Sequence, residues 1–114
     1  LEALGATVIY LPGTAPGTET KVDLAALLRD LARREVNELH VEAGEKLNAS
    51  LVREHLVDEF LVYLAPKIIG RGREMAGFGP LTDLAQALPL TFLSTERVGP
   101  DLRIVARIEG RDAF

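Results

Sequence analysis

The sequence contains no cysteine, no tryptophan and only one methionine. Without cysteine the chain can form no disulfide, no thiolate metal site and no thiol nucleophile, which fits a cytoplasmic protein. No apolar run approaches the roughly 20 residues that a membrane-spanning helix needs, so we expect no membrane segment. The net charge of −4 lacks the basic excess of a nucleic-acid-binding face, so we expect no nucleic-acid partner.

What the sequence does contain is enough apolar material for one packed domain. Apolar residues make up 47% of the 114 positions, which leaves room for a single core. Four Phe and two Tyr are the only aromatic residues, so the core must be built from Leu, Val, Ile and Ala. The chain begins with Leu1 rather than Met, and we expect it to start inside a longer protein.

Apolar segments and helical periodicities alternate along the first half of the chain. Leucines at helical spacing follow Asp23, whose carboxylate is a suitable N-cap, and a second helix is predicted over residues 45–55. Short apolar runs rich in β-branched residues predict three strands, at residues 6–11, 38–42 and 57–65. This strand–helix order predicts parallel strands that are joined by right-handed crossovers.

The second half of the chain shows a different order of predicted elements. Residues 70–80 form a Gly-rich loop, and residues 81–88 are at most a short helix. Two strands, 89–98 and 102–110, flank a Gly-Pro-Asp turn and predict an antiparallel hairpin. The predicted fold class is therefore α/β: a mostly parallel sheet with helices on its faces and an antiparallel C-terminal edge.

Glu42 and Gly44 follow the second predicted strand and precede the second helix. In open α/β sheets, ligands bind beyond the carboxyl ends of the strands. A glycine there permits a tight turn and close approach of a ligand, and the helix that follows offers free N–H groups to a phosphate. The alternative is that Glu42 caps the helix and Gly44 only makes the turn. The spacing alone favours this second interpretation.

A larger set of residues carries a resemblance to a known family. The segment from residue 41 to residue 70 resembles the C-terminal part of the reductase domain of the bifunctional riboflavin-biosynthesis deaminase/reductase, a member of the dihydrofolate-reductase-like superfamily. The resemblance covers nearly the whole chain and is most specific over residues 56–70. The matching residues are Val41, Glu42, Ala43, Gly44, Leu56, Val57, Asp58, Glu59, Ala65, Pro66, Lys67 and Gly70.

This resemblance implies a fold and an activity. The fold would be a three-layer α/β/α sandwich, of which residues 1–114 would be an incomplete, C-terminal portion. The activity would be the NADPH-dependent reduction of 5-amino-6-(5-phosphoribosylamino)uracil to the ribitylamino product. The zinc of the parent enzyme would belong to the absent deaminase domain, and this chain would hold no metal.

The resemblance also assigns residues. Glu42 would be the catalytic and substrate-binding residue beside the nicotinamide and the sugar. Ala43, Gly44, Glu45 and Lys46 would form the loop at the cofactor diphosphate, although the family often has Pro-Thr at the last two positions. The family further implies a cytoplasmic homodimer that uses the C-terminal strands.

Other interpretations remain open. The chain would alternatively be a non-catalytic dimerisation fragment, or part of a dihydrofolate-reductase-like enzyme with another substrate. We expect this chain alone not to reduce substrate, because most substrate-phosphate contacts would lie upstream of Leu1. Structural roles are favoured for His40 and His55, and a solvated loop is favoured over an anion site at Lys67 and residues 70–73.

Overall fold

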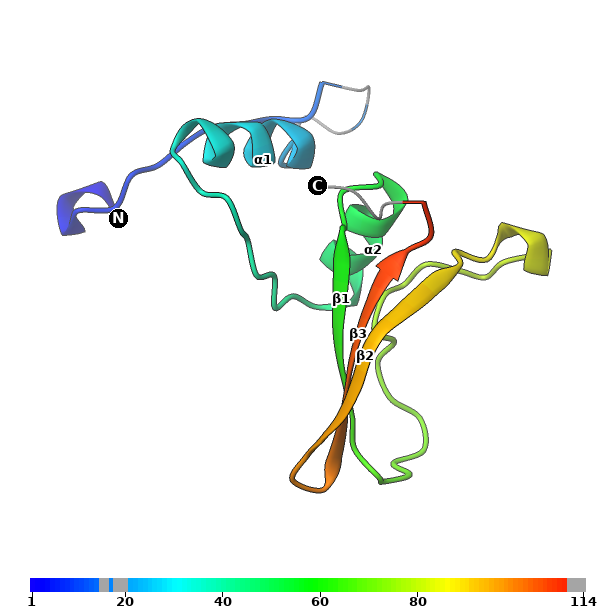
Figure 1. The fold of residues 1–114 in the computed structure, drawn as a ribbon. Helices are drawn as coiled ribbons and strands as arrows, with labels where there is room; N and C mark the ends of the chain where they lie inside the picture. Colours follow the sequence, from blue (N-terminus) through cyan, green and yellow to red (C-terminus); the bar gives the residue numbers. More distant parts are fainter. Residues whose placement is uncertain (15–16, 18–20, 111–114) are drawn as a thin grey trace. The chain divides into compact units, whose positions relative to one another are not determined.

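The computed structural model describes residues 1–14, 17 and 21–110 (Figure 1). The chain divides into two compact units, Leu1–Glu42 and Ala43–Phe114, and each is described by itself. The first unit contains a short 3₁₀ helix, η1 (Glu2–Leu4), and one α-helix, α1 (Leu24–Arg33). The second unit contains helices α2 (Glu45–Arg53) and η2 (Leu84–Gln86) and strands β1 (Glu59–Leu64), β2 (Leu90–Val98) and β3 (Asp101–Ile108).

Helix α1 begins where the sequence predicts it. The Asp23 carboxylate Oδ1 accepts a hydrogen bond from the Ala26 N–H at 2.7 Å, which confirms the predicted N-cap. Near the other end, Arg34 Nε donates to Asp30 Oδ2 at 2.7 Å across one helical turn. Leu24 is the buried residue of this helix. A side chain therefore caps the N-terminus of α1, and an ion pair spans its last turn.

Residues 6–11 and 38–42 form no strand in this structure, in contrast to the prediction. A strand requires a neighbouring strand that pairs with its N–H and C=O groups. Neither segment has such a ladder among the described residues; the first unit contains only an isolated bridge between Pro12 and Val22. Both segments are apolar, as the prediction assumed. The described residues contain no strand that pairs with either of them.

The three strands of the second unit form one antiparallel sheet in the order β1-β3-β2. The predicted C-terminal hairpin is confirmed, with Leu90 opposite Ile108 and Val98 opposite Asp101. Its turn places Gly99 at φ 61°, a conformation that favours glycine. The mostly parallel sheet expected from the sequence is not observed in the described residues, because β1 pairs antiparallel with β3 instead of parallel with an earlier segment.

Opposite charges stand directly across the strands. Glu59 of β1 is opposite Arg107 of β3, and the guanidinium Nε donates to Glu59 Oε2 at 3.2 Å. Glu96 of β2 is opposite Arg103 of β3, and these two side chains also form a hydrogen-bonded ion pair. The hydrogen bond with Glu96 raises the pKa of Arg103 above its usual value. Both pairs support the observed register.

The core of the second unit is small. Figure 1 shows α2 at the end of the sheet where β1 begins and β3 ends. Every residue of β2, one of the two edge strands, is exposed. The buried residues are Ala49, Leu51 and Val52 of α2 and Ala106 and Ile108 of β3. Apolar residues of α2 and of the central strand β3 thus supply the small core of this unit.

Candidate functional site

The Glu42 carboxylate is directed to solvent. Its side chain is 87% exposed, and its one described partner is His40, whose Nε2 lies 3.4 Å from Glu42 Oε1. No side chain makes a capping hydrogen bond to α2, so the interpretation of Glu42 as a helix cap is not supported. A carboxylate that is accessible and not used as a cap is available to a ligand. His40 therefore lies beside Glu42, and the structural role favoured for it stays a prediction.

Gly44 is the N-cap of α2, and its surroundings are open. Its backbone angles, φ −84° and ψ 172°, are extended and accessible to any residue. A glycine permits this turn, but the backbone conformation does not require one. A Cβ atom added at Gly44 would meet no atom within 4 Å. The space beside this backbone is therefore free for a ligand.

The N-terminus of α2 differs from that of α1. Asp23 caps α1, whereas no side chain caps α2. The first-turn N–H groups of a helix and its dipole together favour an anion such as a phosphate. Glu45 places a carboxylate in this turn and Lys46 an ammonium group, so the two side-chain charges offset each other. The first-turn backbone N–H groups suit a diphosphate. The side chains of the same turn add no net positive charge that would attract it.

The Gly-rich loop is attached to α2. Asn48 Nδ2 donates to the Met75 carbonyl at 2.9 Å and to the Ala43 carbonyl at 3.2 Å. The Gly77 N–H donates to the Glu45 carbonyl at 3.1 Å. Arg53 Nη1 donates to the Gly77 carbonyl at 3.1 Å. Residues 75–77 thus lie against the start of α2, and nothing in the sequence predicts these contacts. Residues 70–73, for which a solvated loop is predicted, are exposed.

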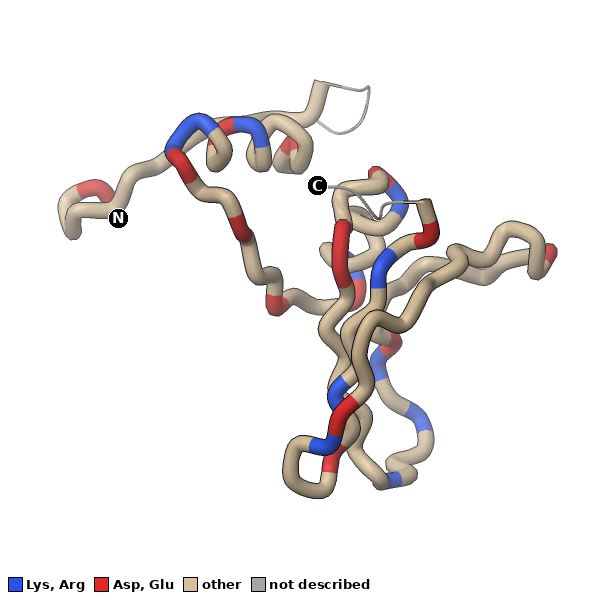
Figure 2. The backbone as a smooth tube through the Cα atoms, viewed as in Figure 1, with Lys and Arg blue, Asp and Glu red and all other residues tan. Residues whose placement is uncertain are grey.

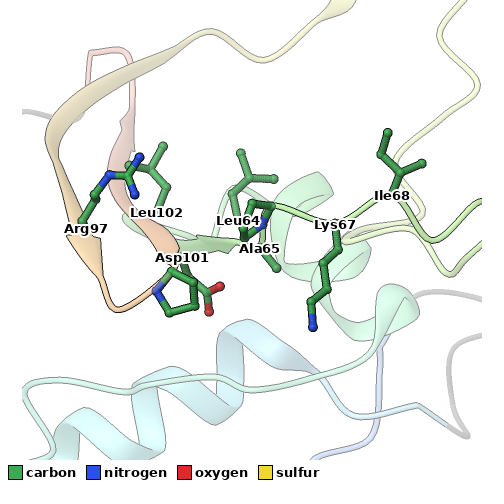
Figure 3. A pocket seen from close by; sticks show the side chains of 9 residues that line it. Leu64, Ala65, Lys67, Ile68, Arg97, Asp101 and Leu102 are labelled. Atoms are coloured by element: carbon green, nitrogen blue, oxygen red, sulfur yellow. The ribbon is translucent and has the colours of Figure 1, made fainter.

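A separate hollow of about 400 Å³ lies at the opposite end of the sheet (Figure 3). Figure 3 shows Lys67 and Ile68 on the chain leaving β1 and Arg97, Asp101 and Leu102 on the hairpin. Leu64, Ala65, Pro66 and Pro100 complete its lining. The hollow contains none of residues 42–46, and most of its lining is apolar. It is therefore not the predicted cofactor site.

The distribution of charge agrees with the composition. Basic residues are spread through both units and do not gather on one element (Figure 2). Within residues 1–14, 17 and 21–110, no group of three or more His, Asp or Glu is placed to hold a metal ion. Among the same residues, every helix is too short or too polar to cross a bilayer.

Comparison with known proteins identifies relatives along most of the chain. The RibD C-terminal domain model matches residues 2–104. The riboflavin biosynthesis protein RibD of Haemophilus influenzae is 38% identical over 88 residues, which are 76% of this chain and 24% of that protein. The 5-amino-6-(5-phosphoribosylamino)uracil reductase of Buchnera aphidicola is 30% identical over 86 residues, which are 75% of this chain and 42% of that protein.

A solved structure shows the same fold. RibD of Acinetobacter baumannii superposes with a TM-score of 0.77 at 24% identity, over 94% of this chain and 28% of that one. The chain therefore spans about a quarter to two fifths of the length of the proteins it matches.

Proposed function

This chain belongs to the RibD C-terminal domain family, and we propose that residues 1–114 are the C-terminal portion of a reductase domain of riboflavin biosynthesis. The proposed reaction is the NADPH-dependent reduction of 5-amino-6-(5-phosphoribosylamino)uracil, the substrate in the name of the Buchnera relative. One observation carries the proposal. The exposed Glu42 carboxylate, which caps no helix, directly precedes the N-terminus of α2. No side chain caps this N-terminus, and the space beside Gly44 is open.

Each residue of this segment has a proposed role. Glu42 accepts hydrogen bonds from the ribose hydroxyls and orients the sugar, since an ionised carboxylate is an acceptor with two oxygens. Ala43, Gly44, Glu45 and Lys46 hold the NADPH diphosphate through the first-turn N–H groups of α2. The bound nicotinamide would supply the hydride, so the chain's own contribution is binding and orientation.

The complete domain would also explain the two segments that lack partners. We propose that residues 6–11 and 38–42 become parallel strands of a three-layer α/β/α sandwich when the rest of the domain is present. Val8, Ile9, Leu39 and Val41 are each about 40% to 47% exposed, although they are apolar. Apolar surface of this kind gains from cover by further strands and helices. We expect the isolated chain to show no turnover for the same reason.

Titration of the 114-residue chain with NADPH, followed by cofactor fluorescence, tests the proposal. We expect saturable binding, because the backbone donors of residues 44–46 are present in this chain. His55→Ala, at the other end of α2, serves as the control and should bind NADPH as the unmodified chain does. Absence of saturable binding would remove the cofactor role of residues 43–46 and leave the dimerisation fragment as the better proposal.

We also propose a cytoplasmic homodimer that uses the C-terminal strands. β2 is an edge strand whose nine residues are all exposed, and an unprotected edge favours pairing with a second copy. Phe92 of β2 is 67% exposed. A large aromatic side chain at such a position suits an interface better than bulk water.

Light scattering tests this dimer. We expect twice the mass of one chain at micromolar concentration, and Phe92→Lys should shift the protein to the monomer because it places a charge in the interface. The variant should remain folded, since Phe92 is exposed. Leu84→Lys is the control, because Leu84 is an exposed apolar residue of η2, outside the C-terminal strands. A monomeric mass for the unmodified chain would contradict the proposed dimer.

A further inference from the structure

We propose that Asn48 is a positioning residue that holds the Gly-rich loop against the segment Ala43–Lys46. The inference deepens the proposed function and rests on it in one respect: the segment that Asn48 holds is the proposed cofactor site. The observation behind it is the pair of hydrogen bonds from one side-chain nitrogen to Ala43 and Met75.

The chemistry of the amide suits this position. The carboxamide nitrogen of asparagine carries two N–H donors, so it can satisfy two carbonyl groups at once. Asn48 Nδ2 lies 2.9 Å from the Met75 carbonyl oxygen and 3.2 Å from the Ala43 carbonyl oxygen. Alanine supplies no donor, and an aspartate carboxylate would place an acceptor against two acceptors. Asparagine is thus one of few residues of this size that can join both segments.

Two further contacts fix the same part of the loop. The Gly77 N–H donates to the Glu45 carbonyl, and the Arg53 guanidinium donates to the Gly77 carbonyl. A Cβ atom added at Gly77 would lie 4.0 Å from Glu45, which is ordinary van der Waals contact. The loop backbone therefore touches the first turn of α2 along residues 75–77.

The loop has little structure of its own. Residues 70–80 belong to no helix or strand, and within this stretch the Phe78 N–H donates to the Ala76 carbonyl at 2.8 Å. Its position beside α2 therefore depends on Asn48, Arg53 and the Glu45 carbonyl. Because Asn48 and Glu45 belong to the same helical end as the uncapped N–H groups, the loop extends the proposed diphosphate site with a second backbone segment. Release of the loop would weaken cofactor binding and leave those N–H donors in place.

Limited proteolysis tests the positioning role without any cofactor. Arg71 and Arg73 are exposed in the loop, so trypsin reports how often this loop leaves α2. Loss of two hydrogen bonds predicts about tenfold faster cleavage at these sites in Asn48→Ala and at least as fast cleavage in Asn48→Asp. The matched control is Ser50→Ala, since Ser50 Oγ donates to the Lys46 carbonyl within α2 and not to the loop.

Two further measurements separate a local effect from general unfolding. Cleavage at Arg103 of β3 should stay at the rate of the unmodified chain in all three variants. The thermal unfolding midpoint of Asn48→Ala should fall no further than that of Arg53→Lys, which alters another side-chain contact with the loop. Equal cleavage at Arg71 and Arg73 in Asn48→Ala and in the unmodified chain would overturn the proposal, as would accelerated cleavage at every site.

NADPH titration of the same variants connects the loop to the cofactor. We expect the Kd of Asn48→Ala to rise about fivefold and that of Ser50→Ala to stay unchanged. If cleavage accelerates in Asn48→Ala but the unmodified chain binds no NADPH, the loop-positioning role stands and the proposed cofactor site fails. If NADPH binds equally to both chains while cleavage differs, the loop is no part of the cofactor site, and that half of the inference is overturned.

Discussion

Replacement of Glu42 by glutamine is expected to lower the turnover number of the complete reductase about 100-fold, because loss of substrate alignment has effects of this size. Glutamine keeps the length of the side chain but loses the charge that attracts the ribose hydroxyls. The Glu42 side chain is 87% exposed, so its replacement should change the free energy of unfolding by less than about 0.5 kcal/mol. The cofactor Kd should also stay nearly constant, since the proposed diphosphate donors lie at residues 43–46.

Steady-state NADPH oxidation in the protein that carries this segment gives the turnover number. Glu38→Gln is the matched control, because Glu38 is another exposed carboxylate of the same stretch. We expect the Glu38 variant to retain full activity. Full activity of the Glu42 variant, or an equal loss in both variants, would contradict the catalytic role of Glu42.

Replacement of Gly44 by aspartate is expected to weaken NADPH binding at least about tenfold, because the new carboxylate would accept the first-turn N–H groups of α2 and repel a diphosphate. The same substitution should stabilise the helix slightly, by a few tenths of a kcal/mol, since aspartate is a better N-cap than glycine. The backbone at Gly44 is extended and a Cβ there meets no atom within 4 Å, so no strain opposes the change. Affinity and stability are thus expected to move in opposite directions.

Fluorescence titration and thermal unfolding of the 114-residue chain measure the two effects. Gly44→Asn is the control that separates charge from capping, because asparagine caps as well as aspartate without the negative charge. We expect an intermediate loss of affinity for Gly44→Asn. An unchanged Kd in Gly44→Asp would show that the α2 N-terminus does not hold the diphosphate.

The elements that the sequence predicted are those whose determinants are local. Asp23 and the leucines that follow it lie within one helix, so capping and periodicity were sufficient to place α1. The β2–β3 hairpin is likewise joined by a tight turn, and its strands pair with their nearest neighbour in the chain. The apolar runs at 6–11 and 38–42 look the same in sequence, but strand formation depends on a partner that the local sequence does not encode.

The candidate site stays a prediction, and the arguments for it agree with the structure only in part. The position of Glu42 before α2 was derived from the strand–helix order and from the family resemblance, and its exposure agrees with that role. The backbone at Gly44 is accessible to any residue, so the turn does not depend on glycine, whereas the open space beside it is as expected for close approach of a ligand. The contacts of Asn48 with Ala43 and Met75 have no local pattern, since side-chain hydrogen bonds to a distant loop depend on tertiary structure alone.

Residue-resolved NMR of the ¹⁵N-labelled chain during NADPH titration tests the central claim most directly. If the coenzyme binds at the start of α2, the amide signals of Gly44, Glu45 and Lys46 shift saturably and with a common Kd. Signals from the apolar hollow, such as those of Leu64 and Ile68, stay in place. Shifts confined to the hollow, or no shifts at any of these amides, would contradict the claim that the segment after Glu42 receives a dinucleotide.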